Sequence, residues 1–294
     1  MKKIIVLVLF FLVGCSQEVV ETPPPTERPT LPPPTEPVER ARFLTRIMNH
    51  DDERRDYFVY VPVNHNPDNG MIMVLHGFGG EARDLRILGF EALADRLGMI
   101  IVYPQGLFNG TIGSTYWNAN FASGDDDLGF LLALQDRLIE EYDLDSSKVT
   151  MTGISNGGYM VNAFLCEHPD RIGLAINWIG SMNITTYNAC QEPLSVPYLH
   201  VHGTDDTTIP FDEPTRIPEF ETPGNIRFMV EHIAAINGHT DQRTSPYSIT
   251  TERTDFIGGR APVTLLVVEG FGHLPPIPTL VDFDVFELIE TLLP

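Results

Sequence analysis

The sequence has very little positive charge. Among its 294 residues, 19 are lysine or arginine and 40 are aspartate or glutamate, so the formal net charge is −21. Lysine itself occurs only at Lys2, Lys3 and Lys148. A surface this acidic repels the phosphate backbone of nucleic acids and the headgroups of anionic lipids. We therefore expect neither a nucleic-acid partner nor electrostatic docking on a membrane.

Cysteine is equally scarce and occurs only at Cys15, Cys166 and Cys190. Three cysteines are too few for the disulfide framework of a small secreted domain. Whether Cys166 and Cys190 pair stays open, because the sequence does not give the distance between them. The chain also lacks the spacing of a metal site, a phosphate-binding loop and a dinucleotide fingerprint. We therefore expect no metal and no other cofactor.

The amino terminus carries an apolar run, Ile4–Val13, behind the positively charged Met1-Lys2-Lys3. The run is too short for a membrane-spanning helix, which needs about 20 residues, and it is typical of a secretory signal peptide. It ends at Gly14-Cys15, which resembles the lipobox of bacterial lipoproteins. We interpret residues 1–14 as a lipoprotein signal peptide and Cys15 as the lipidated residue. The alternative is an ordinary secretory peptide with an incidental cysteine.

The residues behind Cys15 indicate where the protein is sent. Ser16-Gln17 follow the cysteine and no aspartate is present there, which resembles the outer-membrane pattern of Gram-negative bacteria. Residues 16–40 contain eight prolines and no hydrophobic period. Such a segment acts as a semi-rigid spacer, about 75 Å long at most. We therefore predict an exported protein in which a linker over residues 15–40 joins the envelope to a folded domain over residues 41–294.

From Ala41 onward, short apolar runs typical of buried strands alternate with longer segments that have helical spacing. The strands are predicted at residues 43–49, 57–63, 71–75, 99–103, 149–152, 174–179, 198–201 and 263–268. The helices are predicted at residues 85–97, 128–142, 156–167, 225–236 and 280–293. Such alternation gives an α/β fold whose mostly parallel sheet has helices on both faces. Ligands of such sheets bind at the carboxyl ends of the strands.

One of these strand ends carries a candidate nucleophile. The motif Gly153-Ile154-Ser155-Asn156-Gly157 lies between the strand at 149–152 and the helix at 156–167. A serine on a sharp strand-to-helix turn exposes its hydroxyl, and small neighbours are needed where the backbone passes closely. The pattern therefore predicts Ser155 as a catalytic nucleophile.

A candidate acid and a candidate base follow two later strands. His202-Gly203-Thr204-Asp205-Asp206 comes directly after the strand at 198–201 and offers two carboxylates. We prefer Asp206 to Asp205, because the usual loop in this context places the acid three residues after the glycine and three before a hydrophobic–proline pair. His273 lies on a glycine-flanked loop after the last strand, and a serine nucleophile needs such a base oriented by an acid. His202 is interpreted as a loop-packing residue.

The chain order Ser155, Asp206, His273 is that of the α/β-hydrolase fold. In this fold one oxyanion donor follows an earlier strand, where this sequence has His76-Gly77-Phe78-Gly79-Gly80. The backbone N–H groups of Phe78 and Asn156 are therefore the expected oxyanion hole. No segment resembles the large apolar lid of lipases.

The sequence resembles the secreted polyhydroxybutyrate depolymerase-like esterases, a family that includes feruloyl and acetylxylan esterases. The resemblance runs from about Arg55 to Pro276. Its motifs are Tyr60-Val61-Pro62, Leu75-His76-Gly77, Leu93-Ala94-Asp95, Val102-Tyr103-Pro104, Trp117-Asn118, Asp126-Asp127-Leu128-Gly129-Phe130, Gly153-Ile154-Ser155-Asn156-Gly157-Gly158-Tyr159-Met160, His202-Gly203-Thr204 and Gly272-His273.

The resemblance implies ester hydrolysis through a covalent acyl-enzyme and without a metal. It also implies that the region of Trp117 borders the acyl site, although Trp117 as a packing aromatic is an equal alternative. The family often has a tryptophan and a proline just after the catalytic histidine, whereas this chain has Leu274-Pro275-Pro276. That departure leaves the preferred acyl group open.

We therefore predict a membrane-anchored serine esterase for feruloyl, acetyl or polyester-type substrates, with no cofactor. The sequence leaves the oligomeric state open. A non-catalytic, lipid-anchored binding protein on a hydrolase scaffold is one alternative, and it predicts a broken triad or lost oxyanion glycines. A serine peptidase of the same fold is the other. Dedicated peptidases often add a propeller or a large cap to the domain.

Overall fold

The computed structural model of the protein describes residues 40–120, 124–274 and 281–294. The predicted signal peptide, the lipidation site at Cys15 and the linker up to residue 39 lie outside them, as do Pro275 and Pro276. In the described part of the chain, no helix is long and apolar enough to cross a bilayer. The described residues belong to one compact unit.

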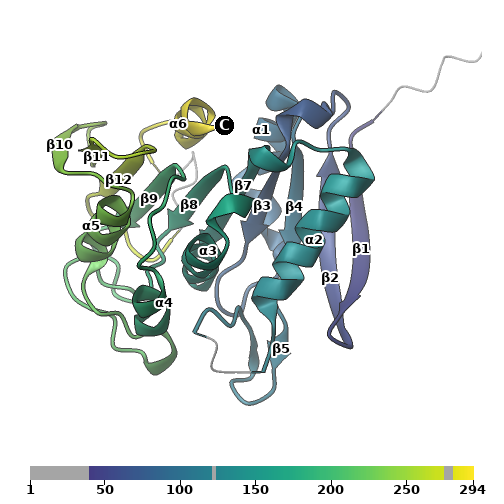
Figure 1. Ribbon diagram of the computed structural model, residues 1–294, viewed down its shortest axis with the longest axis horizontal. Helices are drawn as coiled ribbons and strands as arrows, with labels where there is room; N and C mark the ends of the chain where they lie inside the picture. Colours follow the sequence, from purple (N-terminus) through teal and green to yellow (C-terminus); the bar gives the residue numbers. More distant parts are fainter. Residues whose placement is uncertain (1–39, 121–123, 275–280) are drawn as a thin grey trace, which may run out of the picture. The chain divides into compact units, whose positions relative to one another are not determined.

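The described residues contain a ten-stranded sheet in the order β1-β2-β4-β3-β7-β8-β9-β12-β11-β10, shown in Figure 1. The strands from β4 to β12 in that order are parallel, and antiparallel pairs flank them on both edges. Their bounds are β1 Arg42–His50, β2 Glu53–Val61, β3 Met71–Leu75, β4 Ile100–Pro104, β7 Val149–Ile154, β8 Leu174–Trp178, β9 Tyr198–Gly203, β10 Asp241–Pro246, β11 Thr251–Ile257 and β12 Val263–Val268. A short ribbon pairs β5 (Phe108–Asn109) with β6 (Ser114–Thr115).

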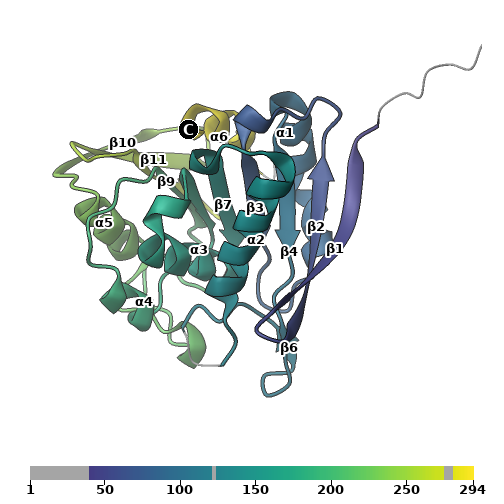
Figure 2. The same ribbon diagram turned by 45° about the vertical axis from the view of Figure 1, so that its right-hand side comes forward.

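Helices cover both faces of this sheet, as Figure 2 also shows. One face packs against α2 (Asp127–Tyr142), α3 (Asn156–Glu167) and α5 (Ile226–Ile236), and α4 (Ile184–Ala189) lies beside α3. The other face packs against α1 (Phe90–Leu97) and α6 (Val285–Leu292). The predicted α/β class, with a mostly parallel sheet between two helical layers, is confirmed.

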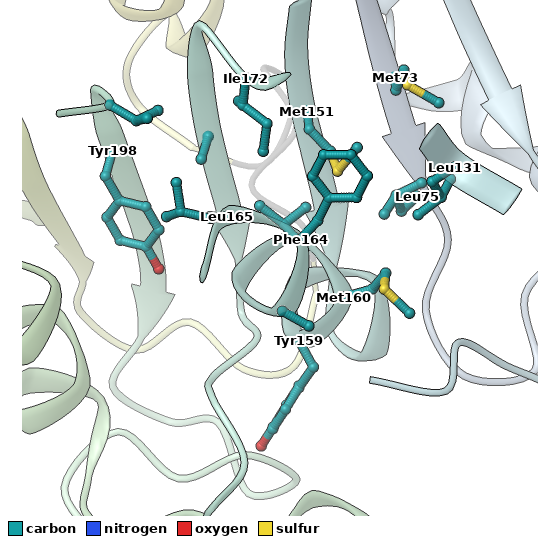
Figure 3. Close-up of a cluster of buried hydrophobic side chains, with 14 of the residues drawn as sticks. Met73, Leu75, Leu131, Met151, Tyr159, Met160, Phe164, Leu165, Ile172 and Tyr198 are labelled. Atoms are coloured by element: carbon teal, nitrogen blue, oxygen red, sulfur yellow. The ribbon is translucent and has the colours of Figure 1, made fainter. Parts of the chain in front are cut away.

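The hydrophobic core surrounds α3 and holds it in a fixed position. Every residue of α3 from Asn156 to Leu165 is buried. Figure 3 shows Met160 and Phe164 of this helix among Met151 of β7 and Leu75 of β3, all of them buried. Because protein interiors are close-packed, a helix held on this many sides has little freedom to move. The turn that leads into α3 therefore has a fixed position.

The prediction of one helix over residues 85–97 is wrong at its centre. The segment forms a 3-10 helix, Ala82–Leu88, and then α1, and Gly89 separates the two with φ 86°. A left-handed residue cannot continue an α-helix. Apolar residues on both sides keep helical spacing, which is why the sequence pattern concealed the break.

The hairpin formed by β10 and β11 was missed by the sequence analysis. All residues of β10 are exposed, and β11 buries only Thr251, Thr254 and Phe256. The hairpin therefore lacks the apolar run by which buried strands are recognised. Pairing with β12 stabilises it, and that contact depends on the tertiary fold.

The two cysteines left open by the sequence form a disulfide in the structure. Cys166 lies in the last turn of α3 and Cys190 caps the end of α4, with their Cα atoms 4.9 Å apart. The bond closes a loop over a sequence separation of 24 residues. It links α4 to α3, the helix that follows Ser155.

Candidate active site

Ser155 occupies a strained turn between β7 and α3. Its φ of 53° lies in the left-handed region, which is uncommon for a residue other than glycine. Its N–H donates to the carbonyl oxygen of Trp178 at 2.9 Å, which ties the turn to the neighbouring strand β8. A Cβ on Gly157 would lie 2.5 Å from the carbonyl oxygen of Leu75. The close approach of β3 therefore requires glycine behind the serine.

The structure brings Ser155, His273 and Asp206 into one chain of hydrogen bonds. Oγ of Ser155 lies 2.9 Å from Nε2 of His273, and Nδ1 of His273 lies 2.7 Å from Oδ2 of Asp206. The His273 side chain is 23% exposed, whereas that of Asp206 is fully buried. The imidazole therefore faces the serine on one side and a desolvated carboxylate on the other.

Of the two adjacent carboxylates, Asp206 is the one that contacts His273. Its Oδ1 accepts from the N–H groups of Thr208 and Ile209 at 2.9 and 2.8 Å. Burial opposes the charge on Asp206, but hydrogen bonds from His202, His273 and Ile209 outweigh it, so the pKa of this carboxyl lies well below its usual range. Asp205 is exposed and accepts from the hydroxyl of Thr204 instead.

The expected oxyanion donors lie on two loops beside Ser155. Phe78 follows β3 and lines the same cavity as Ser155, and Asn156 is the first residue of α3. Among the described residues, neither backbone N–H has a hydrogen-bond acceptor. The start of α3 adds the positive end of a helix dipole at this point. Both groups are therefore free to donate to an oxygen of a bound molecule.

His76 shapes the loop that carries Phe78. Its Nδ1 lies 2.7 Å from the carbonyl oxygen of Gly77, and its Nε2 accepts from the N–H of Gly106 at 2.9 Å. Burial lowers the pKa of His76 to about 4. The ring is therefore neutral at ordinary pH, with the proton on Nδ1, and it holds the loop by one donor and one acceptor.

Trp117, which was expected to contact the substrate, does not line the cavity beside Ser155. The side chain is 1% exposed, and its indole N–H donates to the carbonyl oxygen of His76 at 3.0 Å. Its backbone N–H and carbonyl oxygen pair with the side-chain amide of Asn156 at 2.7 and 2.9 Å. Trp117 thus joins the loop of Phe78 to the turn of Ser155, which is the packing alternative.

A buried ion pair holds the backbone next to Trp117 in place. The sequence analysis assigned this pair no role. Asp127 pairs with Arg55, and both side chains are 1% exposed. The other oxygen of Asp127 accepts from the N–H of Asn118 at 2.7 Å, next to Trp117. Asp127 was present in the motif Asp126-Asp127-Leu128-Gly129-Phe130. A carboxylate at the start of a helix is already explained by its favourable interaction with the helix dipole, so the motif did not indicate a buried ion pair.

A cavity of about 300 Å³ opens beside Ser155. Apart from the serine, its lining consists of aromatic Phe78, Tyr116 and Phe220, branched Ile112, Ile209 and Ile217, and polar Thr208 and Glu219. A larger hollow of about 620 Å³ lies along β10 and β11 and contains none of the predicted site residues. The chemistry and the apolar cavity therefore coincide at Ser155.

Among the described residues, one group brings three potential metal-ligand atoms within 4.8 Å of one another, namely those of His50, Asp51 and Asp126. Asp126 is already paired with His50 at 3.0 Å and caps α2 by accepting from the N–H of Gly129 at 2.9 Å. Exposed Asp51 lies next to this pair. These contacts account for the group as a hydrogen-bonded histidine–carboxylate pair at the start of α2.

Comparisons with known sequences found a matching family and several similar proteins. A model described as the prolyl oligopeptidase family matches residues 90–248, which is more than half of the chain. A bifunctional acetylxylan esterase/xylanase of Neocallimastix patriciarum is 29% identical over 160 residues, 54% of this chain and 22% of that protein. Feruloyl esterase B of Talaromyces funiculosus is 30% identical over 138 residues, 46% of this chain and 39% of that protein. The chain thus covers well under half of these curated relatives.

Comparisons with solved structures agree on the fold. An acetyl xylan esterase from Aspergillus awamori superposes with a TM-score of 0.65 and 18% identity, over 84% of this chain and 99% of that one. A poly(3-hydroxybutyrate) depolymerase from Bordetella parapertussis superposes with a TM-score of 0.54 and 17% identity, over 80% and 86%. The predicted α/β-hydrolase fold and the resemblance to its esterases are confirmed.

Proposed function

The chain belongs to the prolyl oligopeptidase family of the α/β-hydrolase fold, and from this premise we propose that it hydrolyses carboxylic esters through an acyl-enzyme on Ser155. The observation that carries the proposal is the hydrogen-bonded chain from Ser155 through His273 to Asp206, at 2.9 and 2.7 Å. The position of Ser155 in the lining of a largely apolar cavity supports the proposal further, because a short acyl group can lie there.

In the proposed mechanism, Oγ of Ser155 attacks the ester carbonyl while Nε2 of His273 takes its proton. The carbonyl oxygen becomes an oxyanion that accepts from the N–H groups of Phe78 and Asn156. Each such donor is typically worth about 2.7–4 kcal/mol of transition-state stabilisation. His273 then gives the proton to the departing alcohol. Water, deprotonated by His273, releases the acid and restores Ser155, while Asp206 stabilises the imidazolium throughout.

We expect short acyl and aromatic esters to be cleaved faster than long-chain ones. The cavity of about 300 Å³ is lined by Phe78, Tyr116 and Phe220, and aromatic pairs add about 0.5–1.5 kcal/mol beyond area burial. The far end of a palmitoyl chain would extend past this lining and bury little further surface. The measurement is kcat/KM on an aryl butyrate, an aryl palmitate and methyl ferulate, with acetylated xylan and polyester films to choose among feruloyl, acetyl and polyester substrates.

Ile217 and Ile249 provide a matched pair for this experiment. Ile217 lines the cavity, whereas Ile249 is 95% exposed outside it. We expect Ile217→Ala to lower kcat/KM on the butyrate by roughly threefold to tenfold, from the loss of buried methylene contacts. Ile249→Ala should leave it unchanged. A clear preference for palmitate over butyrate would contradict this view of the cavity.

The family description favours a second candidate, a peptidase that acts on proline-containing peptides. The named relatives favour esters, since an acetylxylan esterase/xylanase and a feruloyl esterase are among them. A proline aryl amide and an aryl ester of the same proline derivative separate the two candidates. We expect the ester to be hydrolysed and the amide to persist. Faster turnover of the amide would select the peptidase.

We also propose that the protein is exported and held in the cell envelope by lipids on Cys15. The support is the apolar run Ile4–Val13 before Gly14-Cys15 and the proline-rich residues behind it. Each buried methylene of an acyl chain contributes about 0.8 kcal/mol to membrane binding, so several chains anchor firmly. We expect Cys15→Ser to abolish the membrane-bound form, as measured by fractionation and intact mass, while Ser16→Ala retains it. Membrane-extracted protein with an unmodified Cys15 would contradict the anchor.

A further inference from the structure

We propose that His202 is a positioning residue for Asp206, and that it is itself oriented by His200 and Tyr198 on the same strand, β9. This inference rests on the proposed function, because it concerns the acid of the proposed triad. It replaces our interpretation of His202 as a loop-packing residue. It adds to the site a buried series of hydrogen bonds that ends at the carboxylate.

The three side chains form an unbroken series inside the protein. The hydroxyl of Tyr198 lies 3.1 Å from Nδ1 of His200, and Nε2 of His200 lies 3.2 Å from Nδ1 of His202. The two imidazoles are stacked, with ring centroids 5.4 Å apart and an interplanar angle of 9°. All three residues are at most 2% exposed. Bulk water therefore cannot replace the hydrogen-bond partners of these rings.

The far end of the series holds the loop that carries Asp206. Nε2 of His202 lies 2.8 Å from the carbonyl oxygen of Ile209 and 3.3 Å from Oδ2 of Asp206. The N–H of Ile209 in turn donates to Oδ1 of Asp206 at 2.8 Å. His202 thus contacts both ends of the loop from Asp206 to Ile209. The carboxylate cannot rotate away from His273 without breaking these contacts.

With His202 neutral, the acceptors at this end determine every hydrogen in the series. Both atoms near Nε2 of His202 are oxygens that can only accept, so this nitrogen carries a hydrogen. In a neutral His202, Nδ1 is then an acceptor, so Nε2 of His200 must be the donor. The same argument makes Nδ1 of His200 the acceptor for the hydroxyl of Tyr198. Burial lowers the pKa of His200 well below its usual value, which agrees with a neutral ring.

His202 also affects the charge that Asp206 presents to His273. Its N–H reduces the basicity of the carboxylate, because a donor to the charged form stabilises that form. The titratable groups around Asp206 are His202 on β9, His273 on the loop after β12 and Tyr159 on α3. The hydroxyl of Tyr159 donates to the carbonyl oxygen of Phe220 at 3.1 Å. Of these three groups, the two histidines contact the carboxylate, whereas the hydroxyl of Tyr159 is directed to Phe220.

Two amide substitutions at His202 separate its two contacts. An asparagine amide reaches about as far as Nδ1, so His202→Asn can still accept from His200 but cannot reach Ile209 or Asp206. A glutamine amide reaches about as far as Nε2, so His202→Gln can still donate to the loop. We expect His202→Asn to lower kcat by roughly 10- to 100-fold, as for a catalytic group displaced by about 1 Å. KM should change little.

The pH profile distinguishes positioning from a purely structural role. In His202→Asn, the carboxylate without its donor is more basic and stabilises the His273 imidazolium more strongly. The acid limb of kcat/KM, which reports protonation of the free enzyme's base, should therefore move to higher pH. His202→Gln should restore the limb and part of kcat. A His202→Asn enzyme with wild-type kcat, or one that is slower with an unmoved acid limb, overturns the inference.

Controls separate this result from general damage and from failure of the proposed function. Thr254→Val removes another buried hydroxyl contact, with Thr244 at 2.9 Å, and should leave both the rate and the acid limb unchanged. The rate at which Ser155 is sulfonylated by phenylmethanesulfonyl fluoride reports the nucleophile without any assumed ester. If the wild type is labelled at Ser155 but cleaves no ester, the proposed function fails, and the labelling rates of the variants still decide the role of His202.

A measurement on the wild-type protein keeps the inference testable even if a variant does not fold. Nitrogen-15 shifts of histidine side chains report which ring nitrogen carries hydrogen. We expect His200 and His202 to hold it on Nε2. Finding the hydrogen of His202 on Nδ1 alone would overturn the inference, because Nε2 could then donate to neither Ile209 nor Asp206.

Discussion

Replacing Ser155 by alanine is expected to lower kcat for ester hydrolysis by about six orders of magnitude, as the loss of a triad nucleophile typically does. The hydroxyl oxygen lies 2.9 Å from Nε2 of His273, the base that activates it. Without this hydroxyl, no acyl-enzyme forms. The measurement is the initial rate on the best short aryl ester, together with the yield of acyl-enzyme trapped by acid quench.

The control for Ser155→Ala is Ser147→Ala. Ser147 lies in a surface turn before β7, where its hydroxyl donates to Asp145 at 2.6 Å, so its loss should not affect turnover. Both variants should unfold with cooperative thermal transitions. A Ser155→Ala enzyme that keeps more than a few per cent of wild-type turnover would end the assignment of the nucleophile. A wild type that binds esters without cleaving them would select the non-catalytic alternative.

Replacing Asp206 by asparagine is expected to lower kcat by about four orders of magnitude. The amide can donate to Nδ1 of His273, which now lies 2.7 Å from a carboxylate oxygen. The imidazole would then hold its hydrogen on Nε2, facing Ser155, and could no longer accept the proton of the hydroxyl. The measurement is kcat/KM as a function of pH, because an enzyme with the wrong tautomer recovers only where hydroxide replaces the missing base.

Asp205→Asn is the matched control, since it changes the neighbouring carboxylate in the same way. Asp205 is exposed and contacts the hydroxyl of Thr204. We expect its turnover to stay within about twofold of the wild type, as for most surface substitutions. Equal losses in both variants would mean that the loop tolerates no change at all. A larger loss in Asp205→Asn would reverse the choice between the two acids.

The sequence by itself determined those features that depend on neighbouring residues. The strand β7, the turn at Ser155 and the helix α3 follow from a buried apolar run, a glycine-flanked serine and helical spacing, and the structure has them at nearly the predicted residues. The alternation of strands and helices fixed the α/β class for the same reason. Glycine-rich loops after β3, β9 and β12 directed attention to Phe78, Asp206 and His273.

Only the tertiary structure decided features that depend on distances between segments remote in the sequence. The loop spacing favoured Asp206 over Asp205, and the structure decides between them, because only Asp206 is buried against His202 and His273. The sequence allowed Trp117 to be an acyl-site residue or a packing residue. The hydrogen bond from its indole N–H to the carbonyl oxygen of His76, 41 residues away, identifies it as a packing residue. Cys166 and Cys190 pair because α3 and α4 end side by side. The hydrogen-bond series through His202 depends on the loop returning over β9, because chain topology alone brings the carbonyl of Ile209 to that ring.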